Sequence, residues 1–91
     1  MYFITMLEGK DGLGRCVGYV SDFNEAEKIV KNNMYDIWEH IYEYAIIEEI
    51  DEGIYQWCEY PKWHKYNKEE NKYEPCNRPE WAKGFAGFGI G

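Results

Sequence analysis

The sequence has no long hydrophobic run and few cysteines, and each shortage excludes a class of protein. No apolar stretch approaches the ~20 residues that a membrane-spanning helix requires. The chain does not open with the basic and then apolar segments of a secretory signal. Its three cysteines, Cys16, Cys58 and Cys76, are an odd number, which is typical of free thiols in a reducing compartment. We therefore expect a cytoplasmic protein with reduced cysteines and no membrane partner.

Basic residues are also scarce, which argues against nucleic acid as a partner. The chain has 10 Lys and Arg against 17 Asp and Glu, a net charge of −7, whereas nucleic-acid-binding domains present a basic face. Residues 1–50 carry ten acidic and four basic residues (net −6), and residues 51–91 carry seven acidic and six basic residues (net −1). The acidic half suits contact with another protein, and the cations of the second half suit a small anion.

Motifs that mark catalytic and metal sites are missing. Zinc sites usually draw on close pairs such as C-x₂-C, whereas Cys58, His64 and Cys76 are separated by six and twelve residues. The glycine-rich stretch GKDGLGR lacks the P-loop pattern, and no nucleophile elbow surrounds a cysteine. We predict no metal, no cofactor and no catalytic residue, and hence a protein that is not an enzyme.

The first half of the chain predicts a β-hairpin followed by one helix. Residues 1–7 (MYFITML) and 15–20 (RCVGYV) are rich in β-branched and aromatic residues, and the glycine-rich turn separates them. Asp22 and Glu25 have the spacing of a capping box, and Asn32–Asn33 predicts the helix end. The apolar stripe expected to face the sheet consists of Phe23, Ala26, Ile29 and Val30.

The second half predicts further strands. Residues 42–50 alternate in polarity and predict a central strand with Glu48 and Glu49 on opposite faces, as charges on a solvated sheet. Lys62–Tyr66 and Lys72–Pro75 predict a hairpin. The segment Met34–Ile41 is ambiguous, although its apolar spacing favours a helical turn. The remaining expected elements are a weak extended segment over Ile54–Tyr60, a helical turn over Pro79–Ala82 and a glycine-rich strand over Gly84–Gly91.

Together these elements predict a single α+β domain over residues 1–91. We expect two layers, with one main helix on an antiparallel or mixed sheet of about five to six strands, in the order β-β-α-β-β-β-β. In the predicted hairpin, Trp63 alternates with Lys62 and His64, which predicts a strand with one buried face, and we expect His64 to lie at the surface. The stretch from Cys58 to Cys76 is predicted to be an edge strand and a hairpin.

Four stretches of the chain are distinctive: RCVGYVSDFNEAEKIVKNN, YAIIEEIDEGIY, KWHKYN with the following EE and KYEP, and the closing FAGFGIG. They resemble a family of small uncharacterised α+β proteins encoded by Firmicutes bacteria and their phages and mobile elements. Together they cover most of the chain. The resemblance implies a small α+β fold and a mobile-element setting in the cytoplasm of a bacterial host. It implies no activity and assigns no functional residue.

Aromatic and basic residues are interleaved in the second half of the chain. Aromatic residues make up 19% of the sequence; flat rings stack on bases and cations hold phosphates, so this mixture suits a nucleotide. Some of these rings must instead form the core, because one helix cannot cover the whole sheet. The predicted ligand-binding residues are Tyr60, Trp63, Lys65, Arg78 and Trp81.

These observations support three hypotheses about function. The first is a non-enzymatic binding protein of a phage or mobile element that sequesters a small nucleotide-derived signal and so counters a host defence. We expect it to be a homo-oligomer, because a small subunit encloses a ligand more easily at an interface. The second is an acidic inhibitor that binds a host defence protein, and the third, least favoured, is a small nucleotide hydrolase.

Overall fold

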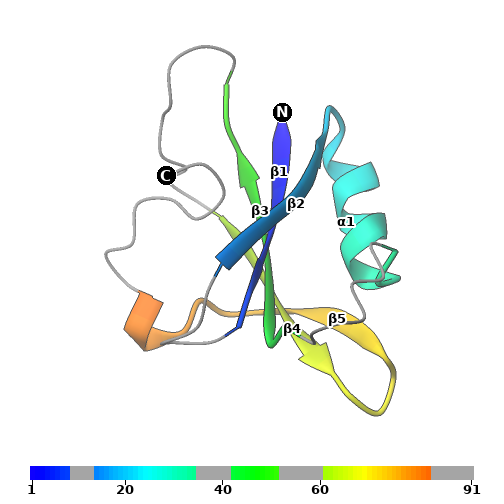
Figure 1. Cartoon of the computed structure of the whole chain (residues 1–91), viewed down its shortest axis with the longest axis vertical. Helices are drawn as coiled ribbons and strands as arrows, with labels where there is room; N and C mark the ends of the chain where they lie inside the picture. Colours follow the sequence, from blue (N-terminus) through cyan, green and yellow to red (C-terminus); the bar gives the residue numbers. More distant parts are fainter. Residues whose placement is uncertain (9–13, 35–41, 52–60, 83–91) are drawn as a thin grey trace.

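The computed structural model describes residues 1–8, 14–34, 42–51 and 61–82. They form one sheet of five strands with one α-helix (Figure 1). The α+β class is therefore confirmed, with one main helix among the described residues. The elements, in chain order, are β1 (Tyr2–Leu7), β2 (Gly14–Val20), α1 (Phe23–Lys31), β3 (Tyr44–Glu49), β4 (Lys62–Asn67), β5 (Lys72–Cys76) and a short 3₁₀ turn, η1 (Glu80–Ala82).

The strands lie in the order β2-β1-β3-β4-β5, and every neighbouring pair is antiparallel. β3 is central, as the alternation of its residues predicted. Along the chain the described order is β-β-α-β-β-β, which differs from the expected order by one strand after the helix. The expected segments at Ile54–Tyr60 and Gly84–Gly91, and residues 35–41 of the ambiguous segment, lie outside the described residues.

One face of the sheet is closed by α1, and we call it the helix face. Ala26 and Val30 are fully buried in its core, and Phe23 and Ile29 pack against the same cluster. The predicted apolar stripe is thus confirmed. Burial of a side chain such as Val30 contributes about 1.5–3 kcal/mol. The sheet supplies the rest of this core, mostly aliphatic, through Ile4, Met6, Ala45, Ile47 and Tyr73.

The ends of α1 follow the sequence only in part. Asp22 occupies the N-cap position, but its side chain makes no capping hydrogen bond, so the predicted capping box is wrong. The backbone N–H of Ala26 instead donates to the carbonyl of Asp22 at 3.1 Å, which begins the helical ladder. At the other end Asn33 has a φ of 50°, the left-handed conformation that Asn tolerates. The predicted helix end is therefore confirmed.

The opposite face of the sheet, which we call the aromatic face, holds a second core. Its buried members are Leu7, Tyr44, Ile46, Trp63 and Ala82, and Cys76 and Trp81 pack against them. Figure 1 shows η1 on the other side of the sheet from α1. The N–H of Ala82 donates to the carbonyl of Pro79 at 3.0 Å, so the predicted turn is confirmed.

Burial along β3 and β4 corrects two expectations. His64 is only 1% exposed and Trp63 only 3% exposed, because α1 covers one side of this part of the sheet and η1 the other. His64 is therefore not a surface residue. Glu48 and Glu49 do lie on opposite faces, but Glu48 is 1% exposed and only Glu49 faces solvent. The predicted hairpin is confirmed: β4 lies between β3 and β5, and β5 lies at one edge of the sheet.

Candidate functional site

The two predicted tryptophans belong to one aromatic cluster on the aromatic face. Trp63, Trp81 and Tyr44 contact one another edge to face. The ring centroid of Tyr44 lies 5.5 Å from that of Trp63 and 5.8 Å from that of Trp81, and the two tryptophan centroids lie 6.0 Å apart. This geometry lets rings fill a core and is worth about 0.5–1.5 kcal/mol per pair beyond the area that it buries. The cluster therefore stabilises the fold, and it leaves no parallel slot between the two indoles for a base.

The predicted cations lie in different places. Lys65 sits on β4 with 57% of its side chain exposed, and its Nζ lies 4.0 Å from a carboxylate oxygen of Glu43. Arg78 follows β5 and lines a cavity together with Trp63. The structure thus brings Trp63 and Arg78 together at one cavity, whereas Lys65 lies outside its lining. Tyr60 lies outside the described residues.

This cavity, which we call the notch, lies beside the first residues of β4, where the antiparallel neighbour β5 has already ended. The pairing of β4 with β5 starts at Trp63↔Cys76, whereas its pairing with β3 continues to Lys62. Beyond Cys76 the chain leaves the sheet, so no described strand pairs with the outer side of the first residues of β4. The notch has a volume of about 450 Å³, which lies in the range of small-molecule sites.

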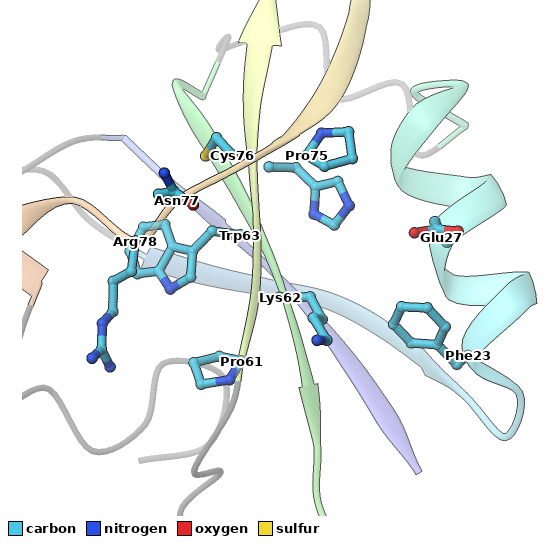
Figure 2. Close-up of a pocket in the computed structure, with 10 residues that line it drawn as sticks. Phe23, Glu27, Pro61, Lys62, Trp63, Pro75, Cys76, Asn77 and Arg78 are labelled. Carbon is cyan, nitrogen blue, oxygen red and sulfur yellow. The ribbon is translucent and has the colours of Figure 1, made fainter.

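Side chains from both faces of the sheet line the notch. Figure 2 shows Phe23 and Glu27 on the α1 side of β4 and Trp63 and Arg78 on the other side, with Lys62 between β4 and Phe23. Lys62 and Arg78 are exposed, whereas Glu27 is partly buried. The site therefore offers two cations, one carboxylate and the ring of Phe23 around a single cavity. Its remaining lining residues are Pro61, His64, Pro75, Cys76 and Asn77.

His64 is the buried polar residue of the notch. Its Nδ1 atom has no hydrogen-bond partner among the residues that the structure describes. Burial lowers the pKa of His64 below its ordinary value of 6.5. This effect outweighs hydrogen bonding to the backbone of Ala45 and the negative charge of Glu27, both of which raise the pKa. The imidazole is therefore neutral near pH 7, with one ring nitrogen available as a donor or an acceptor.

The thiol of Cys76 is not placed for covalent chemistry with His64. Cys76 is paired with Trp63 across the strands and His64 is paired with Pro75, so the thiol and the imidazole point to opposite faces. Burial also raises the pKa of Cys76, although Lys65 acts against it. A protonated thiol is a poor nucleophile and a poor metal ligand. The same geometry separates two of the three residues considered for zinc, and Cys58 lies outside the described residues.

Sequence reasoning did not single out Glu27, His64 or Phe23 as site residues. Phe23 and Glu27 lie four residues apart on α1, and the helical period placed only Phe23 on the buried stripe. The signal available for His64 was its alternation with Trp63, which puts the two on opposite faces. That pattern shows which face a residue occupies, but not what covers the face.

Comparisons with known proteins assign no family to the chain: no family model, no curated protein and no solved structure matches it. Among the described residues, no helix has the length and apolar character of a membrane span. No three metal-ligating side chains of the described ranges cluster together.

Proposed function

We propose that the protein binds a small nucleotide-derived ligand in the notch and holds it without converting it. The observation that carries the proposal is the lining of one cavity by two cations, Lys62 and Arg78, together with the Phe23 ring and the Glu27 carboxylate. Phosphate needs the cations, a base needs an apolar surface, and ribose hydroxyls or base N–H groups need an acceptor. A nucleotide carries all three kinds of group.

Each contact of this kind has a known range of strength. A charge-assisted hydrogen bond to phosphate contributes about 1.5–3 kcal/mol, and a base stacked on an aromatic ring contributes about 1–3 kcal/mol. Lys62 and Arg78 approach the notch from different sides, so they are suited to grip one phosphate between them. Part of the gain is lost in ordering these exposed side chains, and we expect affinities in the micromolar range.

The neutral imidazole of His64 favours a polar ligand over an apolar one. A buried ring nitrogen without a partner costs about 1–3 kcal/mol. A ligand that offers a hydroxyl or amino group to it would recover part of that cost. Glu27 lies on the same side of β4 and would accept a second hydrogen bond. These two residues would orient the part of the ligand that the cations do not hold.

Sequestration is favoured over hydrolysis by the arrangement of the described lining residues. His64 and Cys76 lie on opposite faces of the sheet, so the notch does not pair this thiol with a base. The resemblance to proteins of phages and mobile elements suggests that the ligand is a signal of a host defence. In that setting a protein that removes the signal from solution counters the defence without an enzymatic step.

Calorimetric titration with AMP, GMP, cyclic AMP and ADP-ribose tests the proposal. We expect at least one of these to bind with a Kd below about 1 mM. Arg78→Ala and Lys62→Ala should each weaken binding by about tenfold or more. Lys68→Ala is the matched control, because Lys68 is an exposed lysine in the turn between β4 and β5 and does not line the notch.

The fate of the bound ligand separates the three hypotheses. Sequestration requires that the ligand is recovered intact when the protein is denatured after incubation, and recovery of a cleaved product would instead establish hydrolysis. The absence of binding by every nucleotide at about 1 mM would overturn the proposal. The acidic N-terminal half, with a net charge of −6 from ten acidic and four basic residues, would then favour an inhibitor that binds a protein.

A further inference from the structure

A second cavity of about 450 Å³ lies in the crease between α1 and β5. Glu27 and Pro75 line both this cavity and the notch, so the two spaces adjoin along α1. We call the second cavity the crease. Its other lining residues are Asn24, Lys28, Lys31 and Asn32 from α1 and Lys72, Tyr73 and Glu74 from β5.

Cations dominate the crease. Lys28 and Lys31 occupy the last turn of α1, where they offset the partial negative charge of the helix end. Lys72 comes from β5 and adds a positive charge that the helix end does not require. The crease holds these three lysines against two carboxylates: Glu27 lies 3.6 Å from Lys31 Nζ, and Glu74 accepts a hydrogen bond from the Asn67 side chain at 3.1 Å.

Two cations of the crease, Lys72 and Lys31, lie at the end of the crease that is away from the notch. Lys72 is paired with Asn67, which lies five residues along β4 from Lys62; at about 3.3 Å per residue this is roughly 17 Å along the strand. The helix residues Phe23 and Lys31 are eight residues apart, or about 12 Å along the axis. A mononucleotide in the notch therefore leaves that end of the crease unfilled.

We infer that the ligand is an extended one that runs from the notch into the crease and places a second phosphoryl group among Lys28, Lys31 and Lys72. This inference rests on the proposed function and narrows it to ligands with two separated anionic groups, such as a short oligonucleotide of two units. The polar side chains of Asn24 and Asn32 at the crease are suited to contact sugar and phosphate oxygens.

The affinities of three adenine nucleotides distinguish the effect of ligand length from that of ligand charge. AMP measures the notch alone, and ATP adds two phosphates in one continuous run. The linear dinucleotide pApAp also has three phosphates, but distributes them over two nucleoside units. We expect pApAp to bind at least about tenfold more tightly than ATP, and its affinity to fall more steeply with salt than that of AMP. Equal or weaker binding of pApAp would overturn the inference.

Paired variants locate the second phosphate. Lys28→Ala combined with Lys72→Ala should reduce the affinity for pApAp to that for AMP, whereas Lys62→Ala should weaken both ligands. A double variant that keeps the preference for pApAp would overturn the inference, because the preference would then arise elsewhere. Binding of AMP with no gain for pApAp removes this inference alone. Failure of all three ligands to bind at about 1 mM removes the proposed function as well.

Discussion

The two faces of the sheet build a core from different materials. On the helix face, aliphatic side chains such as Ile4, Ile47 and Val30 pack under α1. On the aromatic face, Trp63, Trp81 and Tyr44 contact one another edge to face. A nine-residue helix can cover many small side chains, whereas a three-residue turn such as η1 covers little area. Among the described residues, large rings on the aromatic face compensate for the small cover of η1.

The comparison also explains why the notch lies where it does. α1 packs mainly on β1, β2, β3 and β5. At the start of β4, Lys62 pairs with β3 but not with β5, and it is there that residues of both faces meet at one cavity.

The largest expected effect breaks the helix face. Val30→Asp places a carboxylate at a fully buried position, and an unpaired buried charge costs about 3–5 kcal/mol. This approaches the whole stability of a small domain, so we expect the variant to be largely unfolded. Circular dichroism and urea denaturation measure the loss. Asn24→Asp adds the same group at an exposed position of α1 and should remain folded; a folded Val30→Asp protein would show that α1 is misplaced.

The next effect breaks the aromatic face. Trp63→Ala removes a ring that is 3% exposed and contacts both Tyr44 and Trp81, and such a truncation costs about 3–5 kcal/mol because it leaves a cavity. Tyr19→Ala is the control, since Tyr19 is 61% exposed and its ring contacts only that of Phe3 among the ring contacts of the described residues, at 5.4 Å, so its loss should cost about 1 kcal/mol. If Trp63→Ala melts like the parent protein but no longer binds nucleotide, the ring belongs to the ligand site and not to the core.

Local patterns in the sequence predicted the elements but not how they meet. The helical period gave the buried stripe of α1, and alternation gave β3 and the β4–β5 hairpin, because these signals arise within a few residues. Burial of His64 depends on α1, which lies more than thirty residues earlier in the chain. No local pattern carries that information, and the expected surface position was therefore wrong.

The candidate site was predictable to a similar extent. Composition indicated rings and cations in the second half, and the structure brings two of the five predicted residues, Trp63 and Arg78, to the notch. Glu27 and Phe23 come from α1, in the first half of the chain, and line the notch opposite residues of β4 and β5. The notch itself depends on the register Trp63↔Cys76, since a β5 longer by two residues would cover it. Strand ends of this kind are the least certain part of any sequence-based prediction.

A smaller effect concerns pH and the helix face. Burial lowers the pKa of His64 below 6.5, so the unfolded state binds more protons than the folded state once the pH falls below about 6.5. The contribution of His64 to stability is therefore complete above that pH and is lost as the pH falls through the folded-state pKa. Glu27 opposes this shift and Lys31 adds to it.

His64→Gln isolates this contribution, because the carboxylates that also titrate in acid are common to both proteins. Urea denaturation at several pH values between about 7 and 5 should show a steeper loss of stability for the parent protein than for the variant. Parallel curves would show that His64 has an unshifted pKa, and hence that the helix face does not exclude water from it.

The smallest expected effect tests whether the helix face excludes water at β5. The buried Tyr73 on β5 donates a hydrogen bond from its hydroxyl to the carbonyl of Tyr42 at 2.8 Å, and Tyr73→Phe leaves that carbonyl without this donor. A hydrogen bond of this kind contributes about 1 kcal/mol. Tyr66 is the matched control: its hydroxyl donates to Asn71 at 2.7 Å in an exposed position. Water can replace that donor, so Tyr66→Phe should cost about half as much or less. Thermal or urea denaturation of both variants measures the difference, and equal losses would show that water reaches Tyr73 and that the helix face is open at β5.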